Sequence, residues 1–309
     1  MRLEIFCLII MNGLSMIIIN MFNKILIGVN LFGIYHRQDV ARESWIHLQK
    51  KYPDKIEFNA IQFESENSAP TDYGIPPKFV LERSSKDIVP HGTKELPILK
   101  DILDYLYSQV KDDPNYTHFG WINSDIITTS IFVEYFQNHD VRALAASRLD
   151  IKEVKNFGQI LENGVTPLRF EPAGFDSYIF SKEWWAKYGH LINPYLLGVP
   201  EFDPVISGII AVTGGELYND PQQPMICHIQ HPIKWGSDSP EKDWNINLKK
   251  SNPFDHLCFN MMHYHLQHNL CHRKPWGAFM NPEPGEKEFT KDFFDIFSLE
   301  TSKQIKYIG

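Results

Sequence analysis

Between Lys24 and Ala146, short apolar runs alternate with amphipathic stretches, and this alternation constrains the fold more than any other feature. The apolar runs have the length of buried strands, and the stretches between them place apolar residues such as Val40, Trp45 and Leu48 at helical spacing. We expect strands over residues 24–30, 56–61, 117–122 and 141–146, and helices over residues 39–51, 96–110 and 131–138. This order predicts an α/β fold with a mostly parallel central sheet flanked by helices.

Composition limits the class of protein further. The 309 residues carry 30 Lys and Arg against 38 Asp and Glu, a net charge of −8, and 43% of them are hydrophobic. A core of ordinary size is therefore available, which excludes global disorder. The acidic balance argues against a nucleic-acid partner bound through its phosphates. The four cysteines form no CxxC pair, so reduced thiols in a cytoplasmic protein are expected.

The N-terminal residues 5–22 are apolar but are interrupted by Asn12, Ser15 and Asn20. A membrane-spanning helix needs about 20 mostly apolar residues, and the strand expected from Lys24 leaves no stem between a membrane and the fold. We expect residues 1–21 to be a poorly ordered extension. The alternative is a membrane anchor, through which the otherwise cytoplasmic protein would associate with a membrane.

After Ile151 the alternation is less regular. Strands are expected over residues 178–180 and 225–229, and helices over residues 182–188 and around residues 254–269. We divide the chain into the extension over residues 1–21, a main domain over residues 22–236, and a C-terminal helical extension of the same domain over residues 237–309.

Asn123, Ser124 and Asp125 follow the strand expected at residues 117–122. Ligands of open parallel sheets bind beyond the carboxyl ends of the strands, so Asp125 can bind a divalent cation while Asn123 contacts a sugar or a metal-bound water. In the alternative interpretation, Asn123 caps a following helix and Asp125 lies in its first turn.

Further charged residues follow other predicted strands or lie between them. Arg148 and Asp150 follow the strand at 141–146, where the arginine forms either an ion pair or a phosphate contact. Asp176 is expected just before a strand. Glu201 and Asp203 lie two residues apart on an extended or looped segment, and paired carboxylates commonly supply a base that takes a proton from a hydroxyl. A solvated loop is the alternative for each.

His228 and His231 close another expected strand and can add imidazole ligands, although a structural histidine is more common. The sequence contains no phosphate-binding P-loop, no GxGxxG and no GxSxG. Their absence removes the most common nucleoside-triphosphatase, dehydrogenase and hydrolase interpretations.

In their order along the chain, these motifs resemble those of GT-A-type glycosyltransferases, which belong to the nucleotide-diphospho-sugar transferase superfamily. The resemblance runs from about Lys24 to Trp235. Residues 119–126, FGWINSDI, are similar to the DxD motif of that family, and residues 148–151 to the strand-end segment that follows it. Residues 174–180 resemble the acceptor side, and residues 198–204 the segment with the candidate base. Asn123 and Phe202 stand where relatives often have Asp and Trp.

The resemblance implies a Rossmann-like GT-A fold for the main domain, and a role for each candidate residue. It implies Asp125, His231 and His228 as ligands of Mn²⁺ or Mg²⁺. For a reaction that inverts the configuration of the sugar, it implies Asp203, with Glu201 second, as the catalytic base, whereas a retaining reaction needs no dedicated base. It implies the following donor-binding residues: Gly28, Val29, Asn30, Arg37, Lys100, Asp101, Asn123, Ser124, Arg148, Asp150 and Asp176.

The resemblance also implies the reaction, which is transfer of a sugar from a nucleotide-diphosphate donor to a hydroxyl of a carbohydrate, lipid or protein acceptor. Peripheral membrane contact is compatible with it. Two alternatives stay open. One is a catalytically inactive module that binds nucleotide sugars, and the other is a sugar nucleotidyltransferase, although residues 28–33 have few of the glycines and cations of that class.

Overall fold

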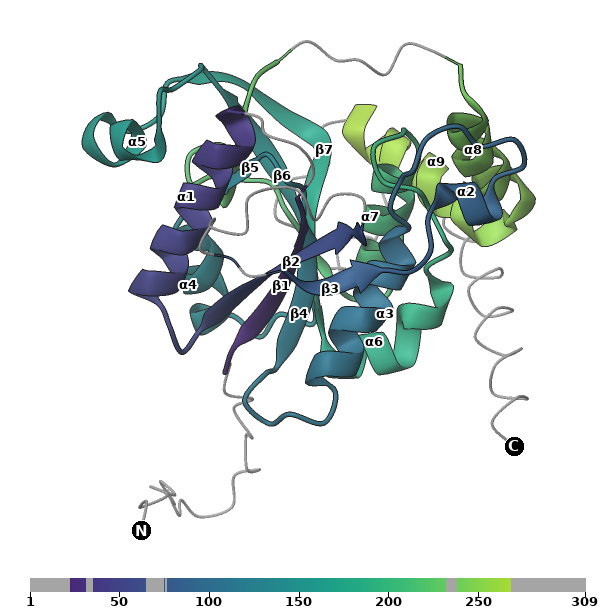
Figure 1. The fold of residues 1–309 in the computed structure, drawn as a ribbon, viewed down its shortest axis with the longest axis horizontal. Helices are drawn as coiled ribbons and strands as arrows, with labels where there is room; N and C mark the ends of the chain where they lie inside the picture. The colour runs from purple at the N-terminus through teal and green to yellow at the C-terminus, as the bar shows by residue number, and fades with distance from the viewer. Residues whose placement is uncertain (1–22, 32–35, 65–74, 76, 232–237, 268–309) are drawn as a thin grey trace, which may run out of the picture.

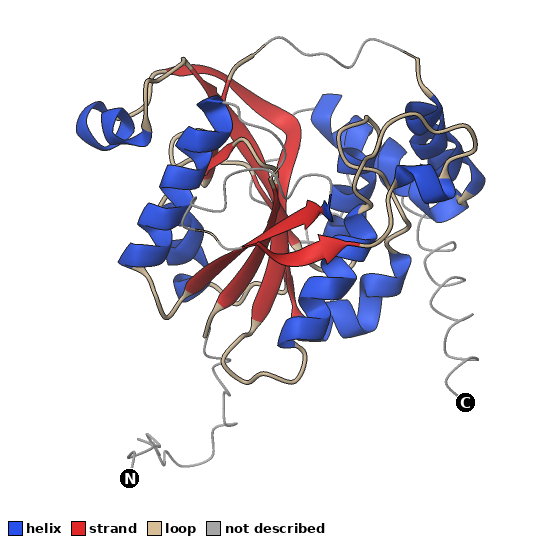
Figure 2. Cartoon of the chain, in the orientation of Figure 1, coloured by secondary structure: helices blue, strands red, loops and turns tan. Residues whose placement is uncertain are grey.

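The computed structural model describes residues 23–31, 36–64, 75, 77–231 and 238–267. A nine-stranded sheet crosses the molecule with helices on both faces (Figures 1 and 2). Its strands are β1 (Ile25–Asn30), β2 (Ile56–Phe63), β3 (Pro77–Leu81), β4 (His118–Ile122), β5 (Ile126–Thr128), β6 (Ala143–Ile151), β7 (Pro167–Ser181), β8 (Glu216–Tyr218) and β9 (Ile226–Ile229).

The strand order is β3-β2-β1-β4-β7-β6-β9-β5, with β8 paired to β6. Pairing is parallel from β3 to β4 and between β6 and both β8 and β9, whereas β7 runs antiparallel to β4 and β6, and β5 to β9. This curled, mostly parallel sheet between helices has the architecture of a Rossmann-like GT-A fold. The predicted fold class is confirmed.

Two hydrophobic cores cover the two faces of the sheet. On one face lie α1 (His36–Lys51) and α4 (Ile131–Asn138), whose Trp45 and Phe132 are fully buried. On the other face lie α3 (Leu99–Val110), α6 (Lys182–Tyr188), α7 (Phe202–Val212) and α9 (Pro253–Gln267) (Figure 1). The remaining helices are α2 (Ser85–Ile88), α5 (Phe157–Asn163), α8 (Pro240–Ser251) and a 3₁₀ turn over Gly189–Leu191.

The central strand β1 is buried along its whole length because helices cover both of its faces. At Gly28 a Cβ atom would lie 2.5 Å from Ile61 Cδ1 and 2.8 Å from Leu106 Cδ1. Glycine therefore lets α3 and β2 approach β1 closely at this position.

Three expectations about local structure were wrong. Arg148 and Asp150 lie inside β6, and Asp176 lies inside β7, because β6 and β7 pair as far as Ile151 and form a long antiparallel arm. The hydrogen bonds of that arm satisfy the backbone of a polar stretch that has little strand character by itself. The segment at residues 201–203 was expected to be extended or looped, but α7 begins at Phe202, so that Glu201 is its N-cap residue and Asp203 lies in its first turn.

The localisation prediction needs correction. Among the described residues, no helix is long and apolar enough to cross a bilayer. The apolar residues 5–22 lie outside the described residues. The predicted association of a cytoplasmic protein with a membrane through that stretch is therefore not supported. The division at residues 21 and 236 stays a prediction, with α8 and α9 in the C-terminal part.

Candidate metal and base site

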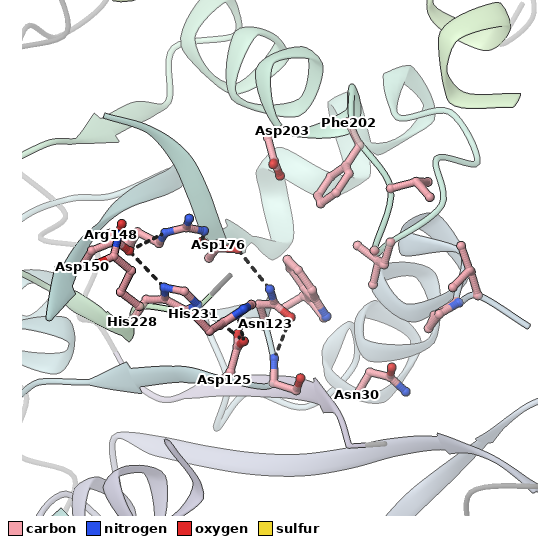
Figure 3. Close-up of a pocket in the computed structure, with 18 of the residues that line it drawn as sticks. Asn30, Asn123, Asp125, Arg148, Asp150, Asp176, Phe202, Asp203, His228 and His231 are labelled. Carbon is pink, nitrogen blue, oxygen red and sulfur yellow. Dashed lines mark hydrogen bonds and ion pairs between the residues drawn. The ribbon is translucent and has the colours of Figure 1, made fainter. Parts of the chain in front are cut away.

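A cavity of about 580 Å³ opens where β1, β4, β6 and β9 end (Figure 3). Its lining mixes ionisable and apolar side chains from distant parts of the sequence. The polar lining residues are Asn30, Glu95, Asn123, Ser124, Asp125, Arg148, Asp150, Arg169, Asp176, Asp203, His228, Gln230 and His231. The apolar ones include Leu96, Pro97, Trp121, Leu197, Val199 and Phe202.

The order of three strands brings Asp125 and the histidines together. Strand β9 lies between β6 and β5, so that His228 is opposite Asp150 on one side and Ile126, which follows Asp125, on the other. His231 comes just after the end of β9. Because β5 directly follows the turn at residues 123–125, the alternative in which Asn123 caps a helix is wrong.

Asp125 Oδ2 lies 3.5 Å from His228 Nε2 and 3.4 Å from His231 Nε2. One ligand atom from each of the three residues lies within 4.8 Å of the ligand atoms of the other two. Asp125 Oδ1 is buried, and no described residue forms a hydrogen bond with it. A buried carboxylate oxygen without a partner, beside two imidazole nitrogens, fits a bound divalent cation.

Asp125 and His228 shift each other's pKa in opposite directions. Burial acts to raise the pKa of Asp125, but the hydrogen bonds with His228 and His231 outweigh it and hold that pKa well below its ordinary value. Arg37 Nε, 3.1 Å from Asp125 Oδ2, acts in the same direction. Burial acts to lower the pKa of His228, but Asp125 and Asp150 raise it to about 9. A cation bound here therefore takes the place of the positive charge on His228.

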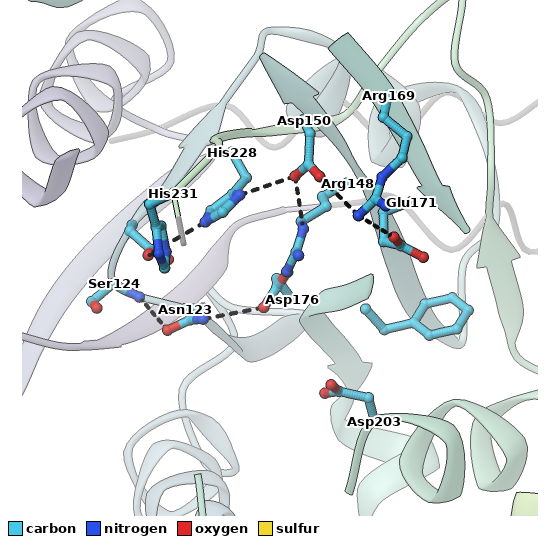
Figure 4. A network of polar contacts seen from close by, with 12 residues as sticks. Asn123, Ser124, Arg148, Asp150, Arg169, Glu171, Asp176, Asp203, His228 and His231 are labelled. Atoms are coloured by element: carbon cyan, nitrogen blue, oxygen red, sulfur yellow. Dashed lines mark hydrogen bonds and ion pairs between the residues drawn. The ribbon is translucent and has the colours of Figure 1, made fainter. Parts of the chain in front are cut away.

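Asp150 fixes the orientation of His228 (Figure 4). Its Oδ1 atom lies 3.0 Å from His228 Nδ1 and accepts a hydrogen bond from Arg148 Nε at 3.1 Å, and the side chain is 2% exposed. When His228 Nδ1 donates to this carboxylate, Nε2 is the nitrogen that faces Asp125. Carboxylates commonly orient metal-binding histidines in this way.

A chain of contacts continues from Asp150 across the cavity. Arg148 lies 2.5 Å from Asp176 Oδ2, and Asn123 donates through Nδ2 to Asp176 Oδ1 at 3.1 Å. The side-chain oxygen Asn123 Oδ1 accepts a hydrogen bond from the backbone N–H of Ser124 at 2.9 Å. The Asn123 side chain thus shapes the turn before Asp125 and links it to β7.

Asp203 lies on the other side of the cavity from Asp125, in the first turn of α7 (Figure 3). Tyr178 lies beside it, with Oη 2.9 Å from Asp203 Oδ1. Burial and the nearby charge of Asp176 raise the pKa of Asp203 well above its ordinary value, and they outweigh Tyr178 and Arg148, which act to lower it. A carboxyl group with a raised pKa in a cleft suits proton transfer near neutral pH.

The structure does not bring every predicted site residue to this cavity. Glu201 forms an ion pair with Lys249 at 2.5 Å and is not in the lining. Lys100 pairs with Asp104 and Asp101 pairs with Arg83, away from the cavity. Gly28 and Val29 are buried within the sheet, with Val29 fully enclosed in a hydrophobic core. Arg37 reaches Asp125 from α1 without lining the cavity. Asn30 and Ser124 do line it.

Sequence reasoning missed Arg169 and Tyr178. Arg169 lies opposite Asp150 in the β6–β7 register and contacts Asp150 and Glu171 at 3.5 and 2.7 Å. Tyr178 meets Asp203 only because α7 packs on β7. Neither contact leaves a local signal in the sequence. Trp121 also lines the cavity, and its buried Nε1 has no partner among the described residues.

No protein-family model matches the sequence, and no curated protein matches it either. Solved structures do resemble the fold. One is the catalytic domain of Drosophila β1,4-galactosyltransferase 7 in complex with xylobiose, with 6% identity, a TM-score of 0.43, and coverage of 72% of this chain and 78% of that one. Another is a variant of that enzyme with manganese, UDP-Gal and xylobiose, with 7% identity, a TM-score of 0.43, and coverage of 72% and 79%.

A third is the mannosyltransferase PcManGT from Pyrobaculum calidifontis in complex with GDP-Man and Mn²⁺. It shares 12% identity at a TM-score of 0.40, over 84% of this chain and 79% of that one. All three are glycosyltransferases, the class that the sequence motifs resemble. With TM-scores below 0.5, these likenesses carry no part of the functional argument, which depends on the geometry of the cavity.

Proposed function

We propose that this chain is a metal-assisted glycosyltransferase that moves a sugar from a nucleoside-diphosphate donor to a hydroxyl acceptor. One observation carries the proposal. A single cavity holds Asp125, His228 and His231 on one side and the half-buried Asp203 on the other (Figure 3). A cation site and a candidate base that face each other suit a displacement in which the leaving group is anionic and the nucleophile must lose a proton.

Asp125, His228 and His231 would hold the cation. Three protein ligands leave coordination positions for diphosphate oxygens and waters. Two imidazoles favour Mn²⁺ over Mg²⁺, which prefers oxygen ligands. When bound, the cation offsets negative charge on the diphosphate that leaves. The absence of an aspartate at position 123 does not remove the site, because the histidines supply the further ligands.

Asp203 would take the proton of the acceptor hydroxyl. We prefer it to Glu201 because Glu201 is paired with Lys249 outside the cavity lining.

For donor binding we retain Asn30, Asn123 and Ser124. Arg148, Asp150 and Asp176 would act by holding one another and His228 in place. The apolar wall with Trp121 and Phe202 would receive the transferred sugar or the acceptor, because aromatic rings commonly pack on sugar faces.

The test is release of nucleoside diphosphate from a panel of UDP- and GDP-sugars, with and without Mn²⁺. We expect Mn²⁺-dependent release with at least one donor, and a loss of at least about 100-fold in Asp125→Asn and in Asp203→Asn. Asp255→Asn is the matched control, since Asp255 is a buried carboxylate outside the cavity lining. Donor binding without turnover would instead support the inactive binding module.

A further inference from the structure

The proton of the Tyr178 hydroxyl has two competing acceptors. Tyr178 Oη lies 2.9 Å from Asp203 Oδ1 and 2.9 Å from the backbone oxygen of Phe175. A phenol has one O–H to donate, so it cannot donate to both oxygens at once. An ionised carboxylate is a stronger acceptor than a peptide carbonyl, and the charge on Asp203 therefore decides which oxygen accepts.

Packing keeps the phenol between these two oxygens. Tyr178 is fully buried, stacks on Trp121 at a ring-centroid distance of 6.0 Å, and meets the ring of Phe202 edge-on at 6.4 Å. Burial also raises the pKa of Tyr178 well above its ordinary value, so that the hydroxyl keeps its proton. The ring cannot move away when Asp203 changes charge, but the O–H bond can rotate.

The charged groups that act on Asp203 come from two strands packed against α7. Asp176 on β7 disfavours the carboxylate, and Arg148 on β6 favours it. Their effects on Asp203 oppose one another because their charges are opposite, and the two side chains form an ion pair with each other at 2.5 Å. Among the described residues, Tyr178 is the side chain that forms a hydrogen bond with the Asp203 carboxylate.

We propose that Tyr178 is a positioning residue for Asp203, donating to its carboxylate while Asp203 is ionised and to the Phe175 carbonyl once Asp203 has taken up a proton. The inference rests on the proposed function. In that reaction the acceptor oxygen bonds to the anomeric carbon and its proton passes to Asp203. The bond from the anomeric carbon to the diphosphate oxygen breaks, and its electron pair leaves on the diphosphate. Tyr178 thus has an acceptor before and after the proton transfer.

The test is a carbon-13 NMR titration of protein labelled at the aspartate carboxyl carbons, with the Asp203 signal assigned by its loss in Asp203→Asn. Tyr178→Phe removes the hydroxyl and keeps the ring. We expect the titration midpoint of Asp203 to rise by about one to two pH units, since a donor to the charged form is lost. An unchanged or lower midpoint overturns the proposal.

Tyr195→Phe is the matched control. Tyr195 donates to the buried Asp255 at 2.6 Å, outside the cavity lining. This variant should move the titration of Asp255 and leave that of Asp203 in place, and an equal rise at Asp203 would overturn the proposal. If Tyr178→Phe does not fold, 3-fluorotyrosine at position 178 supplies a stronger donor. It should lower the Asp203 midpoint, and any other result overturns the proposal.

The titration needs no substrate, so its failure is distinguishable from failure of the proposed function. In donor hydrolysis, the acidic limb of the pH–rate profile should move with the midpoint in Tyr178→Phe. A shifted midpoint without turnover in any variant rejects the glycosyltransferase and supports the Tyr178–Asp203 coupling. Turnover that requires Asp203 but keeps its acidic limb in Tyr178→Phe rejects the coupling alone.

Discussion

Among the three candidate cation ligands, Asp150 contacts His228. Substituting Asp150 therefore tests how the orientation of His228 affects cation binding. We expect Asp150→Asn to weaken Mn²⁺ binding by about 10- to 100-fold, because the neutral amide holds the imidazole less firmly and makes it a poorer ligand. Isothermal titration calorimetry measures this directly. Glu171→Gln is the control, because Glu171 contacts Arg169 and not His228. Equal Mn²⁺ affinity in the wild type and Asp150→Asn would contradict the role given to Asp150.

At the scale of single residues, sequence reasoning named three candidate cation ligands and a candidate base that the structure places around one cavity. Asp125 follows β4, His228 lies near the end of β9 and His231 follows it, and strand ends on one edge of a sheet lie close together. Arg169 and Tyr178 could not be found in this way. Their contacts depend on the register of the β6–β7 arm and on the packing of α7, which no local pattern encodes.

Among the elements, the β4–β7 pair depends on a glycine. At Gly120 a Cβ atom would lie 2.1 Å from the backbone oxygen of Tyr178 and 2.8 Å from Ile179 Cα. Backbone cannot yield as a flexible side chain does, so Gly120→Ala should lower the free energy of unfolding by about 3 kcal/mol or more. Urea denaturation gives this value.

The control for that substitution is Gly158→Ala in α5, where the nearest atom to the new Cβ is a side-chain oxygen of Asn156 at 3.2 Å. It should change the unfolding free energy by no more than about 1 kcal/mol. Comparable losses in the two variants would argue against close contact between β4 and β7.

Helix α9 carries a buried carboxylate that makes stability depend on pH. Asp255 accepts hydrogen bonds from Asn193 at 2.9 Å and Tyr195 at 2.6 Å, and burial raises its pKa from 3.8 to about 6. A raised pKa in the folded state means that this stability is fully present below the unfolded value. It is lost as pH rises through about 6.

We therefore expect Asp255 to lower the unfolding free energy by up to about 3 kcal/mol between pH 3 and pH 8. In Asp255→Asn this part of the pH dependence should be absent. Chemical denaturation of both proteins across that range checks the sign. The same pH slope in the two proteins would show that Asp255 does not contribute it.

Elements with strong periodicity were predicted well from the sequence. The helix at residues 131–138 has the predicted bounds, and β1 and β4 begin one residue later than expected. Strand β7 was expected over three residues and has fifteen. Only the end that crosses the core has an apolar pattern, since the outer part is polar and is held by pairing with β6.

For the whole molecule, charge explains why a cation belongs in the proposed reaction. The protein carries a net charge of −8, and a nucleoside diphosphate is also anionic. Long-range electrostatic repulsion therefore disfavours donor binding. A divalent cation held by Asp125, His228 and His231 would make the local electrostatic potential favourable for the diphosphate. We expect nucleoside diphosphates to raise the melting temperature substantially with Mn²⁺ and much less without it. Equal stabilisation in EDTA would contradict this dependence.

The most direct measurement is an X-ray structure of the protein with Mn²⁺ and UDP or GDP, recorded so that the anomalous signal of manganese locates the ion. The account predicts one strong peak within bonding distance of Asp125, His228, His231 and the diphosphate, with Asp203 across the same cavity. A nucleotide bound in the cavity with manganese elsewhere, or a peak that contacts none of these three side chains, would contradict it.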